Sequence, residues 1–174
     1  MNDFQDIFKA ATSGINSNYF KTEIIIANSK SKIVYRERIY CYELYHQMRN
    51  NWPQDGTLIL FGEYDKNGSQ FFARTSVRGA KPDFSIHTPG KSDANLLAIE
   101  VKPVTARLKY IQSDLKKLHG FLKEANFSFG IFLIYGKGAK TKAIYIKNNR
   151  KNWGIDLNIE IWAHENENEE AILT

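Results

Sequence analysis

Leu96-Leu97-Ala98-Ile99-Glu100-Val101-Lys102 is the stretch of this sequence that decides the fold. It is an apolar run that ends at a proline, which predicts a buried β-strand. Side chains alternate between the two faces of a strand, so the odd-numbered apolar residues share one face. Glu100 and Lys102 share the opposite face. A carboxylate and an ammonium at the end of an apolar strand are costly to bury unless they are paired or bound to a metal.

A second strand is predicted shortly before it, at Asp83-Phe84-Ser85-Ile86-His87. By the same alternation, Phe84 and Ile86 point one way while Asp83, Ser85 and His87 point the other way. A turn is expected between the two strands, over residues 88–93. The pattern therefore places Asp83 on the face that matches that of Glu100 and Lys102.

The rest of the chain predicts helices and further strands around this pair. Residues 4–11 read as a short helix, and residues 32–50 as a helix in which Ile33, Tyr40, Cys41, Leu44 and Met48 recur at helical spacing. A long helix follows Leu108, with an apolar stripe through Ile111, Leu115, Leu118 and Leu122. The remaining segments are expected to be strands at 58–61, from Phe71, at 129–135 and, as a half-buried edge strand, at 155–161. Residues 19–27 and 139–149 fit either a strand or a helix.

This order of elements predicts an α/β fold with one central mixed β-sheet flanked by α-helices. The length of 174 residues suits one domain, 1–174, with a core of about 32–162 and a short acidic C-terminal tail over 165–174. No apolar run approaches the length of a membrane span. The chain has one cysteine and no signal-like start, so a cytoplasmic location is expected.

The charge balance is basic, with 24 Lys and Arg against 19 Asp and Glu. Four of the acidic residues lie in the tail, so the rest of the chain carries 24 basic against 15 acidic residues. A basic body suits a polyanionic partner such as nucleic acid, although such a modest charge serves solubility equally well.

Pro82-Asp83, a turn, and then Glu100-Val101-Lys102 resemble the PD-(D/E)xK signature of the restriction-endonuclease-like nucleases. The order of predicted elements is similar to that family over residues 32–135. The resemblance implies a restriction-endonuclease-like core and a nuclease that hydrolyses phosphodiester bonds, with an endonuclease favoured over an exonuclease.

The resemblance also implies roles for the site residues. Asp83, Glu100 and the backbone carbonyl of Val101 would hold Mg²⁺, for which Mn²⁺ can substitute, and Lys102 would position or activate the attacking water. Mg²⁺ prefers hard oxygen ligands and keeps several waters, so two carboxylates suffice to bind it. A bound Mg²⁺ lowers the pKa of water and stabilises charge that develops on the phosphate.

Glu37 is the next candidate for the catalytic metal site, because it falls inside the apolar stripe of the helix predicted over 32–50. Members of the family carry an acidic residue on the corresponding helix. The alternative is an ion pair with Arg36, Arg38 or Lys81. Glu43 lies on a polar side of the same helix and is less well placed.

Three further residues are secondary candidates for contact with nucleic acid or support of the site: Gln112, Lys81 and His87. Lys109, Lys116 and Lys123 repeat every seven residues, which fits a phosphate-tracking stripe or a solvated helix face. Asp114 is expected to be a surface partner of Lys117.

The sequence leaves several functions open. DNA is favoured as substrate, but nothing separates DNA from RNA. One site per chain favours a homodimer for cutting both strands of a duplex. The segment 36–47 also resembles uncharacterised nucleases of prokaryotic defence. The alternative function is a non-catalytic module that keeps the nuclease fold and binds nucleic acid or assembles with other proteins.

Overall fold

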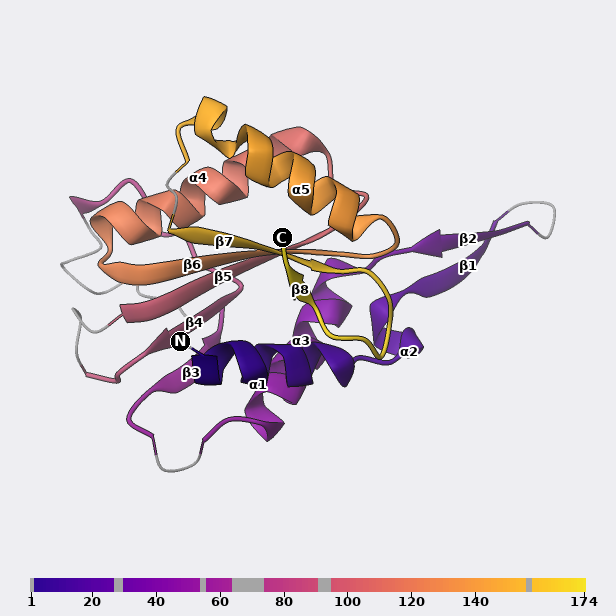
Figure 1. Cartoon of the computed structure of the whole chain (residues 1–174), viewed down its shortest axis with the longest axis horizontal. Coiled ribbons are helices and arrows are strands. Elements are labelled where there is room, and N and C mark those ends of the chain that lie inside the picture. Colours follow the sequence, from indigo (N-terminus) through magenta and orange to yellow (C-terminus); the bar gives the residue numbers. More distant parts are fainter. Residues whose placement is uncertain (1, 27–29, 54–55, 64–73, 91–94, 156–157) are drawn as a thin grey trace.

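The computed structural model describes residues 2–26, 30–53, 56–63, 74–90, 95–155 and 158–174. A mixed six-stranded sheet forms its centre, in the order β3-β4-β5-β6-β7-β8 (Figure 1). Its strands are β3 (Ile59–Gly62), β4 (Phe84–His87), β5 (Asn95–Pro103), β6 (Phe127–Tyr135), β7 (Ile159–His164) and β8 (Ile172–Leu173). β5, β6 and β7 are parallel, whereas β3, β4 and β5 form an antiparallel set and β8 pairs antiparallel with β7.

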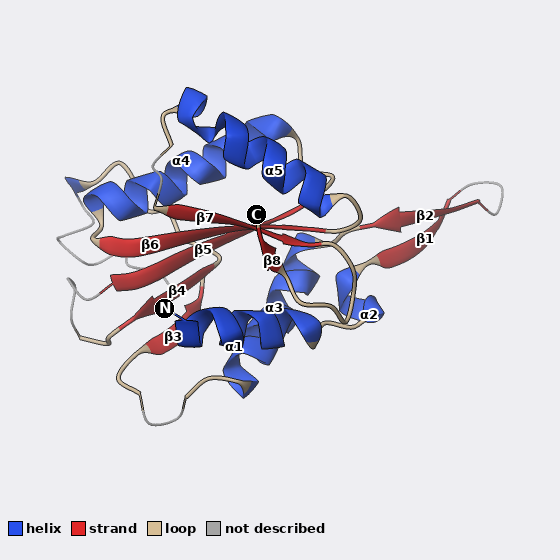
Figure 2. Cartoon of the chain, viewed as in Figure 1, coloured by secondary structure: helices blue, strands red, loops and turns tan. Residues whose placement is uncertain are grey.

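Helices cover both faces of this sheet (Figure 2). α1 (Asn2–Ser13) and α3 (Glu37–Asn50) lie on one face, while α4 (Leu108–Glu124) and α5 (Ala139–Asn149) lie on the other. α4 and α5 are the crossovers that parallel pairing of β5 with β6 and of β6 with β7 requires. The short α2 (Ser17–Phe20) and the 3₁₀ turn η3 (Arg150–Trp153) complete the helices of the described residues. The predicted mixed α/β architecture with a central sheet is confirmed.

The alternation predicted for the deciding strand is confirmed by two separate cores. Leu97, Ile99 and Val101 pack in the core beneath α1 and α3. Ala98 packs in the second core, with Leu115 and other residues of α4 and α5. Each core uses one face of β5, so the charged side chains of Glu100 and Lys102 start from the α4 face.

The helix predicted over residues 32–50 is wrong in its first turn, because it begins only at Glu37. Lys30–Val34 is instead β2, which pairs with β1 (Thr22–Ile26) in a separate two-stranded sheet. Ile33, expected on the apolar helix stripe, is 43% exposed on β2. The apolar spacing of Ile33 suited a helix, but a short β-branched stretch can form a strand equally well when a pairing partner lies close in the chain.

The half-buried edge strand expected over 155–161 is also wrong. β7 begins at Ile159 and lies between β6 and β8, and five of its six residues are buried. Its polar residue Glu160 binds Gln5 and Trp162 rather than facing open solvent. Residues 139–149 form α5, and residues 19–27 divide between α2 and β1. The strand expected from Phe71 lies outside the described residues.

The acidic segment 165–174 packs against the first part of the chain. The buried backbone N–H of Ala171 donates to Thr12 Oγ1 on α1 at 2.8 Å, and Lys21 Nζ lies 2.6 Å from Glu167 Oε1. β8 extends the sheet beyond β7. Among the described residues, no helix combines the length and apolar character needed to cross a lipid bilayer.

Candidate active site

Asp83 and Glu100 lie at the same end of the β4–β5 pair. Phe84 is paired with Ile99, so one step further along this antiparallel ladder Asp83 stands opposite Glu100. Asp83 Oδ2 accepts a hydrogen bond from the backbone N–H of Val101 at 2.7 Å. This bond fixes the Asp83 carboxylate against the strand that carries Glu100 and Lys102.

Glu100 is fully buried, which is unusual for a carboxylate. Lys117 Nζ on α4 lies 2.8 Å from Glu100 Oε1 and provides a counter-charge. Glu100 Oε2 is buried and has no hydrogen-bond partner among the described residues. One oxygen of a buried carboxylate is therefore left to accept a donor or a cation.

Lys102 joins the two helical layers. Its Nζ lies 2.7 Å from Glu37 Oε1, at the start of α3, and 3.0 Å from Asp114 Oδ2 on α4. Asp114 Oδ1 is in turn 3.6 Å from Lys117 Nζ. Charges of alternating sign thus connect Glu37 to Glu100 through Lys102, Asp114 and Lys117.

Burial and mutual repulsion make the two carboxylates reluctant to ionise. Burial raises the pKa of Asp83 to about 6, although the Val101 N–H and the lysines act in the opposite direction. Burial and then the nearby Asp83 raise the pKa of Glu100 well above its usual range, despite Lys117. For Lys102, burial would lower the pKa, but Glu37 and Asp114 outweigh it and the pKa is raised. A cation beside the two carboxylates would relieve this cost.

Two cavities open onto these groups, and Glu37 lines both of them. The first has a volume of about 350 Å³ and is also lined by Asp83 and Tyr42. The second, of about 340 Å³, is lined by Lys102, Asp114 and Tyr110. Asp83 and Lys102 can therefore be approached from the two sides of Glu37, whereas the fully buried Glu100 lines neither cavity.

The donor set fits a divalent cation held by two carboxylates. Asp83 and Glu100 supply hard oxygens, and the unpartnered Oε2 of Glu100 is the observation that favours a cation there. Within the described ranges, no three His, Cys, Asp or Glu side chains group closely enough to hold an ion. Glu37 forms an ion pair, which was the alternative to a role as metal ligand. Its partner is Lys102, which was not among the expected partners. The ligand role of the Val101 carbonyl stays a prediction.

Of the secondary candidates, His87 and Gln112 lie away from the two carboxylates, whereas Lys81 lies two residues before Asp83. His87 stacks on Phe61 four residues beyond Asp83, roughly 13 Å along the strand. Gln112 lies two residues before Asp114 on α4, which is about 200° around the helix, so it faces away. Lys81 contributes its backbone carbonyl, which accepts from Lys117 Nζ at 3.2 Å. Glu43 accepts from Gln47 instead.

Asp114 and Lys117 are the residues that sequence reasoning missed. Their expected contact with each other is present, with Lys117 Nζ 3.6 Å from Asp114 Oδ1, but it is not a surface pair, since both side chains are partly buried and each lies closer to a residue of β5. A signal was present, because Asp114 lies three residues after Ile111 and four before Leu118, inside the apolar stripe of α4. A carboxylate in a buried stripe requires a partner from a neighbouring element.

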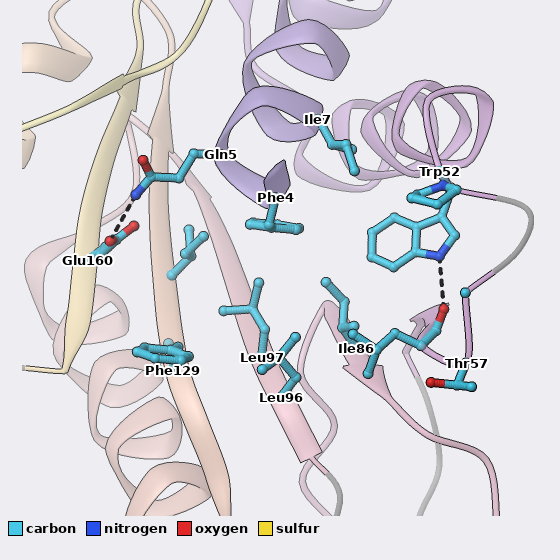
Figure 3. Close-up of a pocket in the computed structure, with 15 residues that line it drawn as sticks. Phe4, Gln5, Ile7, Trp52, Thr57, Ile86, Leu96, Leu97, Phe129 and Glu160 are labelled. Atoms are coloured by element: carbon cyan, nitrogen blue, oxygen red, sulfur yellow. Dashed lines mark hydrogen bonds between the residues drawn. The ribbon is translucent and has the colours of Figure 1, made fainter. Parts of the chain in front are cut away.

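A third cavity, of about 530 Å³, lies on the α1 face of the sheet (Figure 3). Its walls are mainly apolar, and Phe4, Trp52 and Leu97 project into it. Its carboxylate, Glu160, already accepts from Gln5 Nε2 at 3.2 Å and from Trp162 Nε1 at 2.8 Å. This cavity offers no pair of carboxylates, in contrast to the end of the β4–β5 pair where Asp83 and Glu100 lie opposite each other.

Comparisons of this chain with protein-family models, with curated proteins and with solved structures find no match.

Proposed function

We propose that this protein is a Mg²⁺-dependent nuclease that hydrolyses phosphodiester bonds, with DNA as the favoured substrate and an endonuclease action. The observation that carries the proposal is the pair of carboxylates opposite each other beside Lys102, the half-buried Asp83 and the fully buried Glu100. The mixed sheet with helices on both faces supports a restriction-endonuclease-like core. A role in prokaryotic defence and action as a homodimer remain parts of the same hypothesis.

Each residue of the site has a role in this hypothesis. Asp83, positioned by the Val101 N–H, and Glu100 would hold Mg²⁺, which when bound supplies a water of lowered pKa and positive charge for the phosphate. Lys102 is kept protonated by Glu37 and Asp114, so its Nζ can donate to a phosphate oxygen or to the attacking water. Lys117 balances the charge of Glu100 from α4.

The test is incubation of the purified protein with plasmid DNA, linear duplex, single-stranded DNA and RNA, in Mg²⁺, in Mn²⁺ and in EDTA. We expect cleavage with metal and none with EDTA. Asp83→Asn, Glu100→Gln and Lys102→Ala should each reduce the cleavage rate by about 10²–10⁴-fold, since each removes a ligand or donor of the reaction. Glu43→Gln is the matched control, since Glu43 is bound to Gln47 on the same α3 that carries Glu37.

The alternative is a non-catalytic module that binds nucleic acid or assembles with other proteins. The alternating ion pairs from Glu37 to Glu100 favour it, since they balance the buried charges without a metal. Such a module would bind DNA in EDTA with salt-sensitive affinity and would cleave no substrate in any metal. Cleavage that all three site variants retain would refute the nuclease assignment.

A further inference from the structure

A β-arm formed by β1 and β2 projects away from the body of the molecule (Figure 1). The two strands pair only with each other, from Thr22 opposite Val34 to Ile26 opposite Lys30. The arm exposes large apolar side chains, with Ile25 83% exposed and Ile26 43% exposed. An isolated hairpin gains little from burial in its own fold, so exposed isoleucines there indicate a binding surface.

Aromatic residues anchor the base of the β-arm to the body. Phe20 precedes the arm and Tyr35 follows it, and their rings meet edge to face at 6.1 Å. Tyr35 Oη accepts from the backbone N–H of Lys137 at 3.0 Å, just beyond β6. The ring of Tyr35 also meets that of Tyr135, at 5.8 Å. The base of the arm is therefore fixed at the end of β6.

This base lies at the same end of the sheet as the candidate active site. Tyr135 is paired with Pro103 in the β5–β6 ladder, and Pro103 directly follows Lys102. In the chain, Glu37 comes two residues after Tyr35 and begins α3. The β-arm and the charged site are thus joined by a short, well-packed stretch.

Basic residues occur both on the β-arm and next to Glu37 at the candidate active site. Ile24 is opposite Lys32 and Ile26 is opposite Lys30, so one face of the arm carries both lysines beside two isoleucines. Both lysines are exposed. Arg36 and Arg38, also exposed, flank Glu37 in the chain, and Arg38 lines one of the two cavities beside Glu37.

We propose that the β-arm lies along the backbone of a duplex nucleic acid on one side of the active site, with Lys30 and Lys32 on phosphates. This inference rests on the proposed function, because it places the arm beside a bound phosphodiester. Five-residue strands span roughly 17 Å, or about five base pairs at 3.4 Å each. Symmetric contact with a second copy through this face would bring lysines together, which repulsion disfavours.

The test measures duplex binding in EDTA, where no metal-dependent cleavage can occur, as a function of salt. The double variant Lys30→Ala/Lys32→Ala should bind more weakly, and the slope of log affinity against log salt should fall by about 1.8. The control is Lys147→Ala/Lys151→Ala, which removes the same charge from exposed positions at the end of α5 and on η3. Duplexes shortened by about five base pairs on one side should lose the difference between the wild type and the arm variant.

An unchanged salt slope in the arm variant, or an equal fall in the control variant, would overturn the proposal. So would an arm-dependent dimer in light scattering, or the absence of duplex binding by the wild type. Cleavage with Mg²⁺ is scored separately. A protein that cleaves but binds independently of the arm refutes only the arm, while one that binds through the arm but never cleaves refutes only the nuclease.

Discussion

Asp83 holds a half-buried carboxylate, and this has a cost in stability. Burial raises its pKa from an ordinary 3.8 to about 6, so between these values the folded protein keeps a proton that the unfolded chain has released. The free energy of unfolding therefore falls as pH rises from about 4 to about 6, and the loss is complete above that window. Glu100, whose pKa is also raised, acts in the same direction.

Asp83→Asn should consequently stabilise the metal-free protein at neutral pH. We expect a gain of about 3 kcal/mol at pH 7.5 and a much smaller gain at pH 4.5, since roughly 1.4 kcal/mol accompanies each pKa unit. Urea unfolding in EDTA at both pH values measures it, with Glu43→Gln as control. A gain that does not change with pH would contradict the assignment of a buried ionised carboxylate.

Lys117 neutralises the charge of Glu100. Replacing Lys117 therefore tests whether a metal ion can balance that charge instead. Lys117→Met leaves a buried carboxylate without its cation and should lower the free energy of unfolding by about 3 kcal/mol in EDTA. Mg²⁺ should restore part of this loss, and it should raise the melting temperature of the variant more than that of the wild type.

Lys116→Met is the control for this experiment, because Lys116 is the exposed neighbour of Lys117 on α4. It should change neither the stability nor the response to Mg²⁺. If Mg²⁺ leaves the melting temperature of Lys117→Met unaltered, the two carboxylates do not bind the ion.

At this scale, strand alternation was sufficient to place Asp83, Glu100 and Lys102. These residues lie at the same end of the β4–β5 pair, because side chains on a strand alternate every two residues and the connection between the two strands is short. The partners of these groups could not be predicted in the same way. Asp114 and Lys117 reach the site through the packing of α4 on the sheet, and that packing depends on side chains distant in the sequence.

Among the elements, the turn after β6 determines how the β-arm is attached. Gly136 has a φ of +109°, and a Cβ there would lie 2.8 Å from Cζ of Tyr35 and 2.9 Å from Cγ1 of Val104. Gly136→Ala should therefore destabilise the protein by about 2–4 kcal/mol, from backbone strain and from displacement of Tyr35.

Gly138→Ala is the matched control for that substitution. Gly138 has a φ of +90°, but no atom lies within 4 Å of its Cβ position, so only the strain applies. Denaturant unfolding of both variants should show the larger loss for Gly136→Ala. Equal losses would show that the contact with Tyr35 contributes nothing.

The elements differ in how far the sequence determined them. The long stripe of α4 and the apolar run of β6 were predicted because each has many residues in one period. β2 was missed because it has only five residues and runs directly toward a true helix at Glu37. In such a short segment, hydrogen bonding to β1 determines that a strand forms. The spacing of apolar residues within the segment gives no information about that partner strand.

For the whole molecule, composition and element order predicted the mixed α/β class but not the arrangement of the last strands. β7 was expected at an edge, yet β8 covers it, and β8 has only two residues. The acidic composition of residues 165–174 indicated only a short tail outside the core. Single contacts, such as that of Ala171 with Thr12, hold this segment in place, and composition cannot reveal them.

The contact between Thr12 and Ala171 has a consequence for the order in which the fold forms. It joins two groups that are 159 residues apart in the chain. Contacts between residues so distant in sequence require the closure of a long loop, which costs conformational entropy before the contact gives anything back. We therefore expect this contact between α1 and residue 171 to form late in folding.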